Sequence, residues 1–284
     1  MPNSSPPTTD IKSTFDEDGF IVIADLVSPE EIAAARTAAA NIIERFDPAL
    51  HPTVFTTKDR DRGRDDYFMG SAEAIHCFAE ADAVNERGEL TRPKAQAINK
   101  IGHALHDLDP VFGAICRLPQ IAQLARDVGY RAPEVWQTMY ICKPPKVGGE
   151  VRWHQDASYL ATEPACVTGI WIALEDATCT NGCLWVQPGG HRSPLRERYE
   201  VSPDTGVGTL HTLDDTPWPG AGEGLALEVK AGTAIVFKDQ LPHYSSHNHS
   251  NRSRHAFALH IAEGDAEWSR RNWLQRPTLT PFKI

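Results

Sequence analysis

The stretch Val151-Arg152-Trp153-His154-Gln155-Asp156 is a short β-prone run in which a histidine and an aspartate lie two positions apart. In an extended strand, alternate side chains point to the same face, so His154 and Asp156 would direct an imidazole nitrogen and a carboxylate oxygen toward one point. Two histidines and one carboxylate are the ligand set that holds non-haem Fe(II) and leaves open positions for substrates. The pair alone is more typical of a surface hydrogen bond than of a metal site, so the metal hypothesis requires a third ligand from elsewhere in the chain.

The second half of the chain consists largely of short β-prone runs like this stretch. Short β-prone runs alternate there with proline and glycine, and at least seven of them at this spacing predict an all-β sandwich or barrel core. The runs cover residues 135–142, 151–156, 167–174, 183–187, 225–229, 233–238 and 254–261.

The first half of the chain shows mainly helical patterns. Ser28-Pro29-Glu30-Glu31 has the residues of a capping box, and it precedes an alanine-rich helix over residues 32–46. Apolar residues at helical intervals predict further helices over residues 98–108 and 119–128. We therefore expect a mostly β protein with flanking helices: a disordered tail over residues 1–14, then a single domain over residues 15–284, helical to about residue 130 and with its β core at about residues 135–265.

Composition excludes several classes of function. The 284 residues include 38 acidic and 28 basic side chains, for a net charge of −10, which argues against binding to nucleic acid or to an anionic membrane. The N-terminus lacks the apolar core of a signal peptide. Six cysteines scattered in apolar surroundings are typical of buried, reduced thiols, so we expect a cytoplasmic protein. The sequence has no Gly-x-Ser-x-Gly elbow and no phosphate-binding glycine loop between a strand and a helix.

A third ligand is available between the last two predicted strands. The turn formers in residues 243–254 predict a hairpin in which His243 and Arg254 face the same cavity. A 2-oxo acid could then chelate Fe(II) while its distal carboxylate takes two parallel hydrogen bonds from the arginine.

These residues resemble the phytanoyl-CoA dioxygenase family of Fe(II)- and 2-oxoglutarate-dependent oxygenases. The resemblance rests on His154-x-Asp156 followed by His243-x-Ser245-x-x-Asn248-x-Ser250-x-x-x-Arg254, and on the stretch from Asn181 to His191. Gly190 is a departure, since the family usually has serine there. Residues 98–106, 148–151, 154–158 and 272–275 are similar to the domain-containing protein subgroup of this family, and the likeness extends from about Phe15 to near the C-terminus.

The resemblance implies a double-stranded β-helix, that is a jelly roll, with iron held by His154, Asp156 and His243. Arg254 would bind the distal carboxylate of 2-oxoglutarate. Lys100 and Ser245 would assist it, and Met139 and Trp171 would form walls of the same pocket. From the residues alone, Lys100 also fits a solvated helix face, and Met139 and Trp171 also fit ordinary core positions. The other nearby histidines, His247, His249 and His255, lack the spacing to Ser245 and Arg254 that favours His243.

The expected activity is hydroxylation of a small organic substrate with O2, with release of succinate and CO2 and with ascorbate in support. The presence of Asp156 favours hydroxylation or desaturation over halogenation, because related halogenases lack this carboxylate. One alternative is a non-catalytic module that binds 2-oxoglutarate and metal as a sensor. Another is a zinc hydrolase, which the presence of Arg254 and the absence of a His-Glu-x-x-His pattern disfavour. The entrance for the substrate would be lined by Arg152, Trp153 and Tyr159 and by the loops over residues 53–68 and 192–218.

Overall fold

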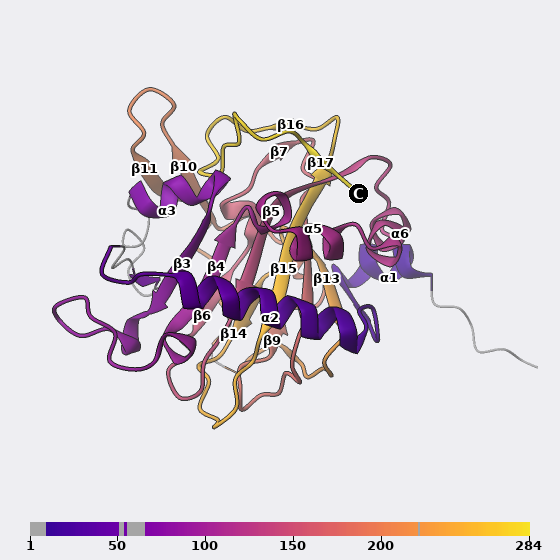
Figure 1. Cartoon of the computed structure of the whole chain (residues 1–284). Coiled ribbons are helices and arrows are strands. Elements are labelled where there is room, and N and C mark those ends of the chain that lie inside the picture. Colours follow the sequence, from indigo (N-terminus) through magenta and orange to yellow (C-terminus); the bar gives the residue numbers. More distant parts are fainter. Residues whose placement is uncertain (1–9, 51–53, 56–65, 221) are drawn as a thin grey trace, which may run out of the picture.

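Two antiparallel β-sheets form the centre of the computed structural model (Figure 1), which describes residues 10–50, 54–55, 66–220 and 222–284. The larger sheet contains nine strands, and all its pairs are antiparallel except β2 with β3. In spatial order these strands are β1 (Phe20–Ile23), β13 (Ala234–Lys238), β8 (Thr168–Ala173), β15 (Ala256–Glu263), β5 (Pro133–Ile141), β4 (Ile98–His103), β3 (Ile75–Glu80) and β2 (Val54–Phe55), with β17 (Phe282–Lys283) beside β5.

The smaller sheet carries four strands, in the order β12 (Leu225–Leu227), β9 (Leu184–Val186), β14 (His243–Ser245) and β6 (Val151–His154). From β5 onward the chain passes back and forth between the two sheets, which is the connectivity of the jelly roll that was predicted. Two short ribbons lie outside the sandwich: β10 (Glu197–Val201) pairs with β11 (Gly208–Thr212), and β7 (Thr162–Glu163) pairs with β16 (Glu267–Trp268).

Helices cover the outer face of the larger sheet (Figure 1). The longest, α2 (Pro29–Arg45), begins with the predicted capping box: Ser28 Oγ accepts a hydrogen bond from the Glu31 backbone, and the Glu31 carboxylate accepts one from the Ser28 backbone. The other helices are α1 (Ile11–Asp18), α3 (Asp66–Gly70), α4 (Leu105–Leu108), α5 (Pro110–Cys116) and α6 (Pro119–Asp127), with 3-10 turns η1 (Ser71–Glu73), η2 (Ala81–Ala83), η3 (Lys94–Gln96), η4 (Asp156–Ser158) and η5 (Gly190–Arg192).

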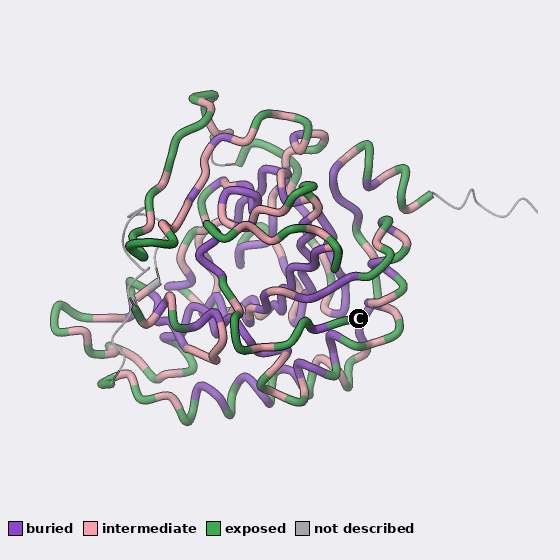
Figure 2. Tube along the Cα trace, turned by 90° about the horizontal axis from the view of Figure 1, so that it is seen from above, coloured by how far each residue is buried: buried purple, intermediate pink, exposed green. Residues whose placement is uncertain are grey.

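The main hydrophobic core lies between these helices and the larger sheet. It joins the inward side of α2, including Ala39 and Ile42, to sheet residues such as Ile172 and Leu259. A second apolar cluster, with Trp171 and Leu184, lies between the two sheets. Figure 2 shows the buried segments in the middle of the molecule and the exposed ones around them. The space between the sheets is therefore lined by rigid, well-packed strands.

Several expectations from the sequence were wrong in detail. Residues 98–103 form strand β4 and not the start of a helix, because all six are buried and a strand covered on both faces has no alternating pattern. The part of the chain before residue 130 also supplies β1, β2 and β3 to the larger sheet. Residues 11–14, assigned to the tail, belong to helix α1, since Asp10 caps it. The remainder of the proposed tail, residues 1–9, lies outside the described residues.

The segment between His243 and Arg254 is not a hairpin. Strand β14 pairs with β6 and β9 in the smaller sheet, whereas β15 lies between β5 and β8 in the larger one. The connection therefore crosses from one sheet to the other. It holds its shape through Asn248, whose side-chain amide donates hydrogen bonds to the carbonyls of Lys143, Pro144 and Arg252.

All six cysteines are free thiols, and four of them are buried. Burial raises the pKa of the Cys77 thiol to about 12, so this thiol stays protonated at neutral pH. Among the described residues, none of the helices combines the length and the apolar character needed to span a bilayer.

Candidate functional site

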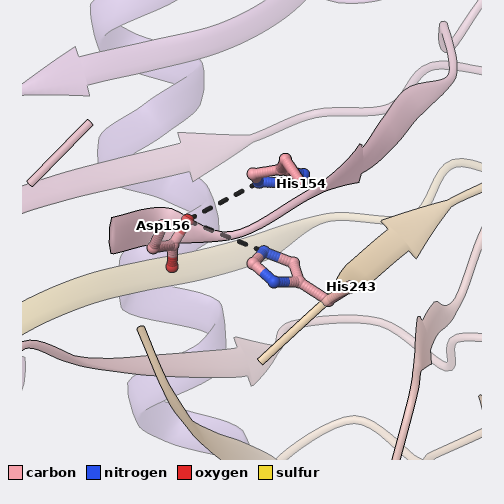
Figure 3. A group of neighbouring side chains, drawn as sticks. All are labelled: His154, Asp156 and His243. Atoms are coloured by element: carbon pink, nitrogen blue, oxygen red, sulfur yellow. Dashed lines mark ion pairs between the residues drawn. The ribbon is translucent and has the colours of Figure 1, made fainter. Parts of the chain in front are cut away.

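The two predicted histidine ligands are brought together by strand pairing in the smaller sheet. His154 ends β6, His243 begins β14, and the two are direct partners in the register of these strands, with ring centroids 4.1 Å apart. Asp156 lies just beyond β6 as the first residue of η4, not within the strand as expected. Its carboxylate nevertheless faces both rings, so one ligand atom from each residue lies within 4.8 Å of the others (Figure 3).

Backbone carbonyls orient both imidazole rings. Nδ1 of His154 lies 2.8 Å from the Arg152 carbonyl oxygen, and Nδ1 of His243 lies 2.9 Å from the Leu241 carbonyl oxygen. A carbonyl oxygen only accepts, so each Nδ1 carries the proton, and in the neutral ring Nε2 presents a lone pair. The two Nε2 atoms lie 3.5 and 3.7 Å from Oδ1 of Asp156.

Charge at this point favours a bound cation. Burial lowers the pKa of His243 to about 4, so its ring is neutral at neutral pH. Burial by itself would raise the pKa of Asp156, but its interactions with the neighbouring His260, His243 and His154 hold it well below its usual range. An ionised carboxylate oxygen and two nitrogen lone pairs thus converge without a proton between them. These three atoms fit a divalent metal ion, since such an ion would turn their mutual repulsion into coordination.

His260, which the sequence patterns did not single out, holds the remaining oxygen of Asp156. It lies on β15, and its Nε2 is 2.9 Å from Oδ2 of Asp156, so the ring donates to the oxygen that faces away from the two histidines. This leaves Oδ1 as the atom directed at the histidine pair. No local signal marks His260, because the contact joins residues far apart in the chain.

A cavity of about 480 Å³ lies between the sheets and contains these three side chains. All the other residues proposed from the sequence line it as well, namely Lys100, Met139, Trp171, Ser245 and Arg254. Arg152, Trp153 and Tyr159 also line it, as expected for an entrance, whereas the first part of the entrance loop proposed over residues 53–68 lies mostly outside the described residues.

Arg254 lines the cavity although it is only 1% exposed, and it is held in place by its neighbours. Its Nε donates to the Gly182 carbonyl oxygen at 3.0 Å, and its guanidinium carbon lies 5.1 Å from the Trp171 ring centroid. Burial lowers the pKa of Arg254 to about 10, so the group remains cationic at neutral pH. Nη1 is buried without a hydrogen-bond partner among the described residues. A buried cation with a free donor is suited to an anion.

A second basic group next to Arg254, Lys143, was also missed. Burial, with the neighbouring charge of Arg254, holds the pKa of Lys143 well below its usual range. Its Nζ donates to Ser245 Oγ at 2.8 Å and to the Gly149 carbonyl oxygen at 2.7 Å. Because the amine supplies the proton to Ser245 Oγ, the serine keeps its own hydroxyl proton for another acceptor in the cavity. Gly182 is required beside it, since this residue has φ of +89° and an added Cβ would lie 2.2 Å from the Lys143 side chain.

Lys100 lines the cavity, whereas the other histidines considered as ligands do not. Lys100 Nζ is 3.9 Å from the Met139 sulfur and 5.3 Å from the Phe68 ring centroid, so it points into the cavity and not to solvent. His255 bonds Tyr140 through Nδ1 at 2.6 Å, and the rings of His247 and His249 stack on each other. These three histidines are not among the described residues that line the cavity.

Residues 15–256 match the family described as phytanoyl-CoA dioxygenase (PhyH). The chain belongs to the phytanoyl-CoA dioxygenase family. It is 41% identical over 271 residues to a phytanoyl-CoA dioxygenase of Arabidopsis thaliana, covering 95% of this chain and 94% of the relative. It is 39% identical over 276 residues to the phytanoyl-CoA dioxygenase domain-containing protein 1 of Mus musculus, with 94% of each chain covered.

A solved structure of the same fold is the epimerase SnoN in complex with Fe3+, α-ketoglutarate and nogalamycin RO. The TM-score is 0.63 at 14% identity, and the match covers 95% of this chain and 90% of SnoN. Membership of the phytanoyl-CoA dioxygenase family identifies this chain as an enzyme of the dioxygenase type, and the likeness to SnoN shows the shared jelly-roll architecture.

Proposed function

We propose that this chain is an Fe(II)- and 2-oxoglutarate-dependent dioxygenase that hydroxylates a small organic substrate and releases succinate and CO2. The observation that carries the proposal is the convergence of two imidazole lone pairs and one ionised carboxylate oxygen within 4.8 Å, in a cavity that is also lined by a buried guanidinium. Iron and 2-oxoglutarate, when bound, would supply the activation of O2 and the oxidation of a C–H bond. The phytanoyl-CoA dioxygenase family supports the dioxygenase class.

In this proposal the residues of the chain bind and orient the metal ion and 2-oxoglutarate, and they exclude water. His154, Asp156 and His243 would hold the metal ion. Arg254 would bind the distal carboxylate of 2-oxoglutarate, with the hydroxyl proton of Ser245 directed to the same group. Trp171 and Met139 would form apolar walls around the carbon chain of the co-substrate, and Lys100 would add a positive charge beside it. Such walls keep bulk water away and strengthen each of these electrostatic contacts.

The direct test is an assay for succinate with purified protein, Fe(II), ascorbate, 2-oxoglutarate and O2. We expect succinate to form slowly by uncoupled turnover and faster when a fitting substrate from a panel of small organic acids, alcohols and acyl-CoA esters is added. A sensor module would bind metal and 2-oxoglutarate without forming succinate. Absence of succinate despite measured binding of both would therefore favour the sensor and contradict the proposal.

Replacing His260 with leucine should weaken metal binding although His260 is not itself a proposed ligand. The variant removes the donor that holds Oδ2 of Asp156, and loss of such an outer partner typically reduces metal affinity by roughly 10- to 100-fold. Mn(II) affinity can be measured by calorimetry. His260→Gln keeps an N–H donor and should recover part of the loss. The matched control is His255→Leu, because His255 is a half-buried, hydrogen-bonded histidine of the same chain region that lies outside the cavity. Equal affinities in the leucine variant and wild type would contradict the assigned role of His260.

A further inference from the structure

At the wall of the cavity, His103 provides a buried polar atom without a partner in the described part of the chain. The residue ends β4, is 0% exposed and lines the cavity. Aromatic rings that line the same cavity enclose it: the Phe68 centroid lies 5.3 Å and the Trp273 centroid 5.0 Å from that of the imidazole, both in edge-to-face arrangements. Its Nε2 has no hydrogen-bond partner among the described residues. A buried polar atom without a partner is costly, so this one is expected to serve a ligand.

The hydrogen bonds around Ser71 determine which form of the ring is present. Ser71 Oγ lies 2.5 Å from the Phe68 carbonyl oxygen and 2.7 Å from Nδ1 of His103. The hydroxyl has a single proton, and the carbonyl can only accept, so Ser71 donates to Phe68 and accepts from Nδ1–H of His103. Burial, with the nearby charge of Lys100, holds the pKa of His103 well below its usual range, so the ring is neutral. Nε2 is therefore a hydrogen-bond acceptor.

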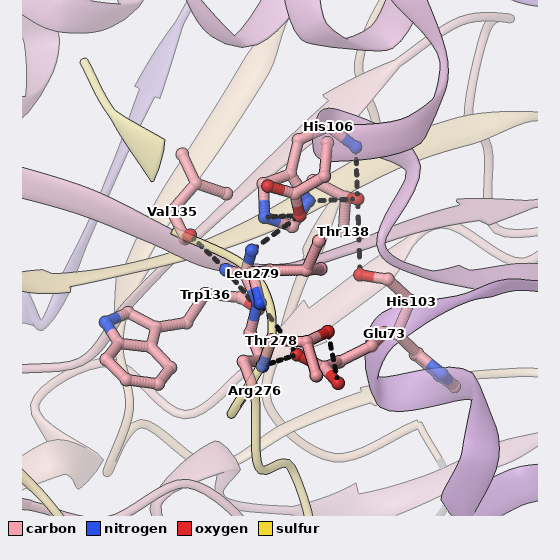
Figure 4. Close-up of polar contacts among 10 residues, drawn as sticks. Glu73, His103, His106, Val135, Trp136, Thr138, Arg276, Thr278 and Leu279 are labelled. Carbon is pink, nitrogen blue, oxygen red and sulfur yellow. Dashed lines mark hydrogen bonds and ion pairs between the residues drawn. The ribbon is translucent and has the colours of Figure 1, made fainter. Parts of the chain in front are cut away.

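The C-terminal segment stabilises the 3-10 turn that contains Ser71. The Glu73 carboxylate, in the same 3-10 turn as Ser71, accepts hydrogen bonds from the backbone of Thr278 and Leu279 at 2.7 and 2.9 Å (Figure 4). Thr138, on the neighbouring strand β5, contacts the carbonyl oxygen of His103 at 3.5 Å in the same network. The ring is thus fixed by the scaffold and does not depend on a ligand for its orientation.

The charge of the surroundings restricts what can bind to this acceptor. An ionised carboxylate has no proton to donate and would face the Nε2 lone pair. An ammonium group could donate, but it would enter a water-poor space that already contains the cation Lys100, whose Nζ lies over the Phe68 ring. An uncharged hydroxyl avoids both penalties, and its carbon skeleton can pack against the Phe68 and Trp273 rings.

We propose that His103 is a specificity-determining residue of the substrate subsite and that it accepts a hydrogen bond from an uncharged hydroxyl group of the organic substrate. The inference rests on the proposed function, since it names the substrate chemistry of that same site. The subsite and the three proposed metal ligands line the same cavity, as does His260, which bonds Asp156. A substrate anchored at His103 would therefore be held by a group other than the one that reacts.

The ring form can be measured directly by correlating the imidazole ¹⁵N and ¹H signals of the full-length protein. We expect Nδ1 of His103 to be protonated and Nε2 to be unprotonated, both in the protein as purified and after addition of Zn(II) and 2-oxoglutarate. The Nε2 signal should shift when cyclohexanol is added. A protonated Nε2 would overturn the proposal. Ser71→Ala should give a mixture of the two ring forms, because it removes the partner of Nδ1 without changing a residue that lines the cavity.

Binding of three probes with the same ring tests the selectivity. Cyclohexanol should bind roughly tenfold more tightly than cyclohexylamine or cyclohexanecarboxylate, the effect of one well-placed hydrogen bond. His103→Leu should lose this preference, and His103→Gln should retain part of it, since the amide oxygen can accept. Equal affinities for the three probes in wild type, no binding of cyclohexanol, or an unchanged preference in His103→Leu would contradict the proposal.

Affinity for Mn(II) and 2-oxoglutarate separates this proposal from the one on which it rests. The His103 and Ser71 variants should bind both as wild type does. If wild type fails to bind metal or 2-oxoglutarate, the proposed function is wrong, whereas the ring form of His103 and the ranking of the three probes can still be read from the protein as purified.

Discussion

Replacing Asp156 with asparagine should reduce Mn(II) and Fe(II) affinity by more than the roughly 100-fold that loss of an outer-shell partner can cost, and should stop formation of succinate. The change keeps the shape of the side chain but removes the negative charge that faces the two Nε2 lone pairs at 3.5 and 3.7 Å. Two neutral imidazoles alone bind a divalent ion weakly, because the carboxylate supplies the charge that offsets dehydration of the ion.

Thermal unfolding offers a second measurement of the same effect. A metal ion at 100 times its dissociation constant stabilises the folded state by about 2.7 kcal/mol, so Mn(II) should raise the melting temperature of wild type but not that of Asp156→Asn. Asp239→Asn is the matched control. Asp239 is also buried near Asp156, and burial raises its pKa to about 7, but it lies outside the group of ligand atoms. A metal-dependent shift of equal size in Asp156→Asn would remove Asp156 from the set of ligands.

The site could be predicted from the sequence only where contacts follow short spacings or a known family pattern. His154 and Asp156 are two residues apart, so local geometry suffices to bring them together even though Asp156 lies in a 3-10 turn beyond the strand. His243 was proposed from the turn formers of residues 243–254, and the family spacing favoured it over the neighbouring histidines. Strand register explains its position, because residue 243 pairs directly with residue 154. The expected hairpin was wrong because spacing along the chain does not show that β14 and β15 belong to different sheets.

Residues that act through tertiary contacts gave no such signal. His260 reaches Asp156 across the space between the sheets, and Lys143 reaches Ser245 from a loop with a positive φ of 35°. The role of His103 depends on which way one hydroxyl proton points, which requires the positions of Ser71 and Phe68. Strand β4 was mistaken for a helix because burial on both faces removes the alternation by which strands are recognised.

Replacing Arg254 with methionine should raise the KM for 2-oxoglutarate by roughly 100-fold, with a smaller change in kcat. The guanidinium group of Arg254 would make two parallel charge-assisted hydrogen bonds to the distal carboxylate of 2-oxoglutarate. Two such bonds together contribute about 3 kcal/mol, which corresponds to a factor of roughly 100 in affinity. Arg254→Lys should recover only part of the loss, because an ammonium group keeps the charge but not the paired geometry. Initial rates of succinate formation at varied 2-oxoglutarate concentration provide the measurement.

The structural contribution of Arg254 must be separated from its contribution to binding, since the residue is fully buried and its Nε also bonds the Gly182 carbonyl oxygen. 2-Oxobutyrate makes this separation, because it keeps the keto acid group but lacks the distal carboxylate. If the guanidinium binds that carboxylate, the methionine variant should use 2-oxobutyrate no worse than wild type does. Arg252→Met controls for loss of a positive charge, since Arg252 is exposed two positions away. A penalty of the same size for both keto acids would mean that Arg254 supports the fold around the cavity and that another basic group in the cavity, such as Lys100 or Lys143, binds the co-substrate.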